Sequence, residues 1–173
     1  MAGMTTEERS EPAVTAAERP MLEGWLDYHR DTLGLKCVGL TDAQLRQASV
    51  PPSQLSLLGL VRHMAEVERH WFRNVMADEG SKPLYYTDED EDGDFHPTDA
   101  DTWEKDGAVW RAEVEAAREI AARHGLDDLS AGRSSRGEQF NLRWIYTHMI
   151  EEYARHNGHA DLVRERIDGA TGD

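Results

Sequence analysis

Residues Ile145 to His159 read IYTHMIEEYARHNGH, and this stretch decides the predicted fold. Side chains four positions apart lie on one face of an α-helix, so His148, Glu152 and His156 form a single stripe. Apolar residues recur at helical spacing beside the stripe, at Leu142, Ile145, Met149 and Leu162. The stripe therefore borders the buried side of a helix, where unpaired polar groups cost roughly 2–7 kcal/mol. A divalent metal ion is the simplest partner that these side chains can share.

The rise of the helix limits which of these side chains can bind one ion. His148 and His156 are two turns apart, about 12 Å along the axis, and an ion with bonds of roughly 2.0–2.2 Å cannot reach both. The adjacent pairs remain: His148 with Glu152, Glu152 with His156, or His156 with His159. A third ligand must come from another helix, and His63 is the best candidate. An apolar stripe lies beside it, formed by Leu60, Met64, Val67 and Trp71. The alternative interpretation is that backbone groups and neighbouring side chains satisfy these residues without a metal.

Charge and composition exclude several classes of partner. The formal net charge is −15, from 34 acidic and 19 basic side chains, which argues against nucleic-acid binding and against docking on anionic lipid. The single cysteine, Cys37, excludes an internal disulfide and indicates a reducing compartment; with no base beside it, it is not interpreted as a nucleophile. No apolar run approaches the roughly 20 residues that span a membrane. We therefore expect a soluble, cytoplasmic protein.

The order of predicted elements indicates an all-α fold. Residues 1–15 are polar and aperiodic and are predicted to be a frayed tail, followed by one helical domain over residues 16–173. A capped helical turn is predicted at Thr41–Leu45. Long helices are predicted from about Glu18 to Gly34 or Gly39, from Ser56 to Ala77, from Thr98 to Gly125 and from Asn141 to Ile167. Four long amphipathic segments joined by long loops are typical of a four-helix bundle.

The acidic segment Asp88–Asp99 has some of the spacing of an EF-hand loop. Asp88, Asp90 and Asp92 occupy its first, third and fifth positions, and Gly93 occupies the sixth. Its last position is aspartate rather than a bidentate glutamate, and the preceding segment is a poor helix. The segment is therefore predicted to be a solvated loop, with calcium binding as the alternative.

Two longer motifs resemble a known family. Residues 58–72 read LGLVRHMAEVERHWF and residues 151–165 read EEYARHNGHADLVRE. Together with the helix pattern from Glu18 to Ile167, they resemble the DinB-like superfamily of metal-binding four-helix bundles, in the bacterial branch near mycothiol-dependent maleylpyruvate isomerase. By position, the resemblance implies that His63, Glu152 and His156 are the metal ligands, which selects the middle of the three pairs. It also implies zinc, with nickel or iron as alternatives.

The resemblance further implies an activity that uses a small thiol. Family members of known activity are transferases or isomerases that depend on mycothiol or bacillithiol, so the expected partners are a thiol and an electrophilic substrate. Candidates for the polar groups of the thiol are Arg143, Arg155, Asp161 and Arg164. A homodimer is expected from the same resemblance. The alternatives are a non-catalytic metal-stabilised module or sensor, with His159 as a fourth ligand, and a metal-dependent hydrolase.

Overall fold

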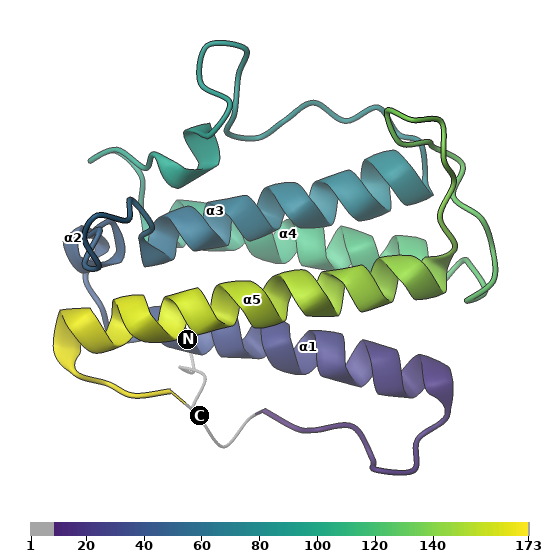
Figure 1. Cartoon of the computed structure of the whole chain (residues 1–173), viewed down its shortest axis with the longest axis horizontal. Helices are drawn as coiled ribbons and strands as arrows, with labels where there is room; N and C mark the ends of the chain where they lie inside the picture. Colours follow the sequence, from purple (N-terminus) through teal and green to yellow (C-terminus); the bar gives the residue numbers. More distant parts are fainter. Residues whose placement is uncertain (1–8, 173) are drawn as a thin grey trace.

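The computed structural model describes residues 9–172, and within them the chain is an all-α bundle without β-strands (Figure 1). Its long helices are α1 (Glu18–Cys37), α3 (Leu57–Glu68), α4 (Trp103–Ala121) and α5 (Leu142–Asp168). Two shorter helices accompany them, α2 (Asp42–Leu45) and the 3₁₀ helix η3 (Gly93–Phe95), and a π-helix, η2 (Arg69–Met76), extends α3. The predicted fold class is confirmed. The first eight residues of the predicted tail lie outside the described residues.

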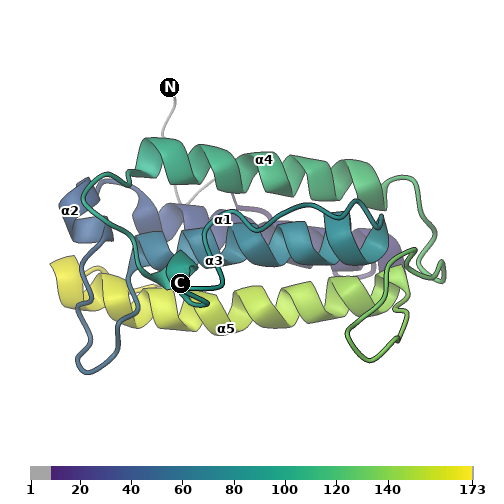
Figure 2. The same ribbon diagram turned by 90° about the horizontal axis from the view of Figure 1, so that it is seen from above.

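The helices pack in two layers (Figures 1 and 2). α3 and α5 form the layer that faces the viewer in Figure 1, and α4 and α1 lie behind them. α1 packs along α5 and α3 packs along α4, while α3 and α5 also contact each other directly. The segment between η2 and α4 crosses over α3 and carries η3. This arrangement brings side chains of α3, α5 and η3 to one place.

Local sequence signals account for most helix ends. The Ser56 hydroxyl accepts a hydrogen bond from the Gly59 N–H, and the Asn141 side chain accepts one from the Trp144 N–H. Thr41 and Gln44 form a reciprocal capping box at the start of α2. α5 ends at Gly169, whose φ of 79° lies in the left-handed region that glycine tolerates best. These ends agree with the sequence-based predictions.

The start of α4 differs from its prediction. The Thr98 N–H and hydroxyl do donate to the Asp101 carboxylate, at 2.7 and 2.9 Å. These bonds close a turn that precedes the helix, however, and α4 begins at Trp103 with Thr102 as its N-cap. Thr98 and Asp101, which were predicted to cap the helix, thus form a turn at the end of the segment that crosses over α3.

A buried polar network connects the four long helices across the bundle. Arg30 of α1 donates to Glu68 of α3 at 2.8 and 2.9 Å. The Tyr153 hydroxyl of α5 donates to the same carboxylate at 2.8 Å, and Trp110 of α4 donates its indole N–H to that hydroxyl at 2.9 Å. Glu68 and Tyr153 are fully buried. The network satisfies charges that would otherwise be unpaired in the apolar core.

Cys37 is buried at the end of α1, and burial raises the pKa of its thiol to about 12. Because the thiolate is the reactive form, we expect the native protein to react with a thiol-specific disulfide reagent at pH 8 only when it unfolds. Absorbance of the released chromophore measures the reaction, with protein in denaturant as the positive control. Rapid labelling of the folded protein would contradict this expectation.

Candidate metal centre

Three of the predicted ligands converge between α3 and α5. His63 stands on α3, and Glu152 and His156 lie one turn apart on α5. One donor atom from each lies within 4.8 Å of the others. His156 Nε2 is 3.5 Å from Glu152 Oε2, and the His63 and His156 rings are 4.6 Å apart between centroids. Two atoms bound tetrahedrally to one ion by bonds of about 2.1 Å are about 3.4 Å apart, so the arrangement fits a single ion.

The three side chains are mostly shielded from solvent, with exposed fractions of 22% for His63, 17% for Glu152 and 11% for His156. Burial lowers the pKa of His156 to about 4, and the neighbouring His63, His159 and Arg155 contribute in the same direction. His156 is therefore neutral at pH 7, the form that binds metals. Each of the three side chains nevertheless keeps some exposure to solvent.

Asp94, which the sequence did not single out, orients His63. Its carboxylate oxygen Oδ2 lies 2.8 Å from His63 Nδ1. A carboxylate only accepts hydrogen bonds, so Nδ1 carries the proton and Nε2 keeps the lone pair that a metal ion can use. Phe95 stacks on the other side of the same ring, with centroids 4.6 Å apart. A carboxylate behind a histidine is a common arrangement at metal sites, where it fixes the ring and raises its basicity.

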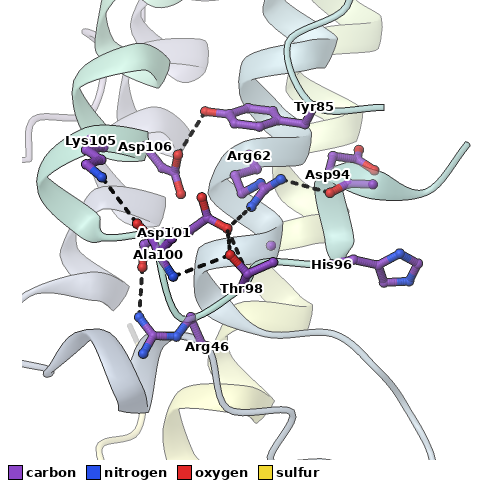
Figure 3. A network of polar contacts seen from close by, with 12 residues as sticks. Arg46, Arg62, Tyr85, Asp94, His96, Thr98, Ala100, Asp101, Lys105 and Asp106 are labelled. Carbon is purple, nitrogen blue, oxygen red and sulfur yellow. Dashed lines mark hydrogen bonds and ion pairs between the residues drawn. The ribbon is translucent and has the colours of Figure 1, made fainter. Parts of the chain in front are cut away.

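Arg62 holds the segment that carries Asp94 in place (Figure 3). Its guanidinium donates to the Gly93 carbonyl and to the Asp101 carboxylate, both at 2.9 Å. The same guanidinium lies 4.3 Å from the centroid of the Tyr85 ring. Gly59, one turn before His63, permits close packing of η3, because a Cβ there would lie 3.3 Å from Phe95 Cα. The crossing segment is thus fixed to α3 beside His63.

Replacing Asp94 with asparagine is expected to weaken metal binding by about 10–100-fold, the usual loss when the outer partner of a ligating histidine is changed. The change keeps the size of the side chain but removes the charge that supports His63. Competition with a chromophoric chelator measures the affinity. The matched control is Asp90→Asn in the same segment, because Asp90 contacts His96 at 3.0 Å rather than His63. Equal affinities in both variants would contradict this role.

The other members of the histidine stripe lie beside the centre. His159 Nδ1 is 3.4 Å from His156 Nδ1, whereas the other nitrogen of the His156 ring, Nε2, is the one near Glu152. The role of His159 stays a prediction. His148 Nε2 is 3.5 Å from the second carboxylate oxygen of Glu152. The structure thus places Glu152 between His148 and His156.

The four candidate thiol-binding residues are engaged in ion pairs spread along α5. Arg143 pairs with Glu18 and Asp127 at the start of the helix. Arg155 pairs with Glu151 and Arg164 with Asp168, each four positions away on α5, while Asp161 pairs with Lys36 of α1. Their role in binding a thiol stays a prediction.

The EF-hand alternative lacks its entering helix, since residues 82–92 are not helical. Within the loop, Asp90 contacts His96 and Asp94 contacts His63, so these two carboxylates do not share a centre. Elsewhere, cavities of about 660 and 210 Å³ are lined chiefly by α1 and α4. The cluster of His63, Glu152 and His156 instead lies between α3 and α5. No helix among residues 9–172 has the length and apolar character that crossing a bilayer requires.

Most of the chain matches the model of a known protein family. A family model described as mycothiol-S-transferase matches residues 21–169, from the first turn of α1 to just past the end of α5. The match includes His63, Glu152 and His156, and it confirms the resemblance that the motifs indicated. A comparison with curated proteins found no match.

Proposed function

Since the chain belongs to the mycothiol-S-transferase family, we propose that it transfers a small thiol, mycothiol, to an electrophilic substrate at a divalent metal held by His63, Glu152 and His156. The convergence of these three side chains, with their donor atoms within 4.8 Å of one another, is the observation that carries the proposal. Two imidazoles and one carboxylate are a ligand set of catalytic zinc sites. We therefore propose zinc, although nickel and iron(II) accept the same ligands.

Residues of this chain hold the three proposed ligands in position without a bound substrate. Asp94 and Phe95 fix the His63 ring, and the turns of α5 place Glu152 and His156 on one face. Three protein ligands leave a coordination position open. A divalent ion bound there lowers the pKa of a thiol and supplies it as thiolate near neutral pH.

The net reaction is an addition or a substitution at the electrophile. One carbon–sulfur bond forms, and the thiol proton ends on the adduct or on the leaving group. Exposed fractions of 11–22% at the three ligands allow the thiol to approach while most bulk water is excluded. Excluding water favours the thiol over hydroxide as the nucleophile. The cytoplasmic location and the homodimer are also part of this proposal, and both stay predictions.

Steady-state kinetics with purified, zinc-loaded protein test the proposal. We expect conjugation of a model electrophile to require both mycothiol and metal, and to be lost in His63→Ala. His124→Ala is the matched control, because His124 forms a comparable i, i+4 pair with Asp128 outside the centre. Turnover that needs metal but no thiol would instead indicate a hydrolase. A stoichiometric metal content that His63→Ala leaves unchanged would overturn the assigned site.

A further inference from the structure

The carboxylate of Glu152 lies between two histidines on the same helix. Its oxygen Oε2 is 3.5 Å from His156 Nε2, and its oxygen Oε1 is 3.5 Å from His148 Nε2. Within residues 9–172 the side chain of Glu152 makes no hydrogen bond, and its two oxygens lie near the two histidine nitrogens instead. The two distances are equal, although only the first belongs to the centre described above. Each oxygen of the Glu152 carboxylate therefore has a histidine nitrogen at the same distance.

A second set of donors surrounds His148. His148, Glu151 and Glu152 each offer an atom within 4.8 Å of the others. Glu151 forms an ion pair with Arg155 through Oε1, while its Oε2 lies 3.5 Å from His148 Nδ1. This oxygen lies beside Nδ1, whereas Glu152 lies beside Nε2 of the same ring, so the half-exposed Glu151 side chain must turn towards Nε2 to share a cation with Glu152. We propose that this chain binds a second divalent cation at His148, Glu151 and Glu152, with Glu152 bridging the two ions.

Helix geometry explains why His148 and His156 would bind different ions. His148 and His156 are two turns apart, about 12 Å along the axis, so one ion cannot bind both. A carboxylate halfway between them can bind one ion with each oxygen, as in two-metal sites. The inference rests on the proposed function in one respect, because Glu152 is shared with its metal centre.

Aromatic packing fixes His148 for this role. The Trp144 ring stacks on it with centroids 5.0 Å apart, and the Trp71 ring meets it edge-on at 4.8 Å. These contacts hold the plane of the imidazole, and Nε2 faces Glu152. The second site has one nitrogen and two carboxylate ligands and is more exposed than the first, since 46% of the Glu151 side chain is accessible. Its oxygen-rich ligand set suits Mn²⁺ as well as Zn²⁺, and we expect it to bind more weakly than the first site.

Metal stoichiometry measured by equilibrium dialysis and elemental analysis tests the second site. With saturating Zn²⁺ we expect two ions per chain in the native sequence and in His124→Ala, and one ion in His148→Ala. Glu151→Gln provides a second variant, because this exposed side chain has little effect on folding, and it too is expected to bind one ion. After loading with Mn²⁺, electron paramagnetic resonance is expected to show spin coupling between two ions, which His148→Ala replaces with the spectrum of isolated ions.

The outcomes separate this inference from the proposed function. One ion per chain, lost in His63→Ala, would leave the first centre standing and overturn the second site. Two ions in both the native protein and the two second-site variants would also overturn it, because the second ion would bind elsewhere. A chain that binds no ion would contradict the proposed function as well.

Discussion

Replacing Glu68 with alanine is expected to lower the free energy of unfolding by about 3–5 kcal/mol, the usual cost of removing one partner from a buried ion pair. Glu68 accepts hydrogen bonds from Arg30 of α1 and from the Tyr153 hydroxyl of α5. Both donors are buried, and without the carboxylate Arg30 keeps, among the described residues, only Asp27 as an ion-pair partner. The change leaves a charged guanidinium and a hydroxyl without this acceptor in the core.

Urea denaturation followed by circular dichroism and tryptophan fluorescence measures this effect. The matched control is Glu119→Ala, an exposed glutamate on α4, whose change is expected to stay within about 0.5 kcal/mol. Tyr153→Phe removes one hydroxyl and is expected to cost about 1–3 kcal/mol, because the Trp110 N–H loses its acceptor. If Glu68→Ala unfolded with the same midpoint as the control, the network would not stabilise the bundle as described.

Replacing His156 with alanine is expected to weaken metal binding at the first site by more than about 100-fold. Losing a ligand should cost more than changing the outer partner of a ligating histidine, which costs about 10–100-fold. Its ring is the most buried of the three ligands, with 11% of the side chain exposed. The remaining side chains, His63 and Glu152, come from different helices and leave only two ligands at the ion. Competition with a chromophoric chelator gives the affinity.

Two neighbouring substitutions make this result specific. His159→Ala removes a ring that contacts His156 at 3.4 Å but does not reach the other two ligands, and it is expected to cost at most about tenfold. His156→Gln keeps much of the volume of the side chain and serves as a check on folding. If His156→Ala and His159→Ala bound metal equally, His156 would not be a ligand.

Much of the fold follows from local signals in the sequence. Ser56, Asn141 and Gly169 mark helix ends by side-chain capping or by a left-handed backbone, and each effect acts within a few residues. The stripe on α5 is equally local, because helical spacing alone aligns Glu152 with His156. The apolar stripe beside His63 already made it the best candidate for a third ligand, but choosing Glu152 with His156 required the family resemblance, since helix spacing left three pairs open.

The features that the sequence did not reveal depend on contacts between distant residues. Asp94 is 31 positions from His63, and it reaches the ring only because Arg62 binds the backbone of its segment. Arg30 and Glu68 are charged residues of a kind that usually lies on the surface, and only the packed bundle shows that they bury each other. The π-helix η2 keeps the apolar pattern of an α-helix but closes Ala77 N–H to Phe72 O, five residues back. Hydrophobic periodicity does not distinguish that spacing.

The central claim is that a thiol reaches a metal held by His63, Glu152 and His156. Absorption spectroscopy of the cobalt(II)-substituted protein tests it most directly, because sulfur bound to cobalt gives an intense near-ultraviolet charge-transfer band. Adding mycothiol is predicted to produce this band in the native protein and in His124→Ala, but not in His63→Ala. A cobalt spectrum that mycothiol leaves unchanged, in native protein shown to contain cobalt, would contradict the account.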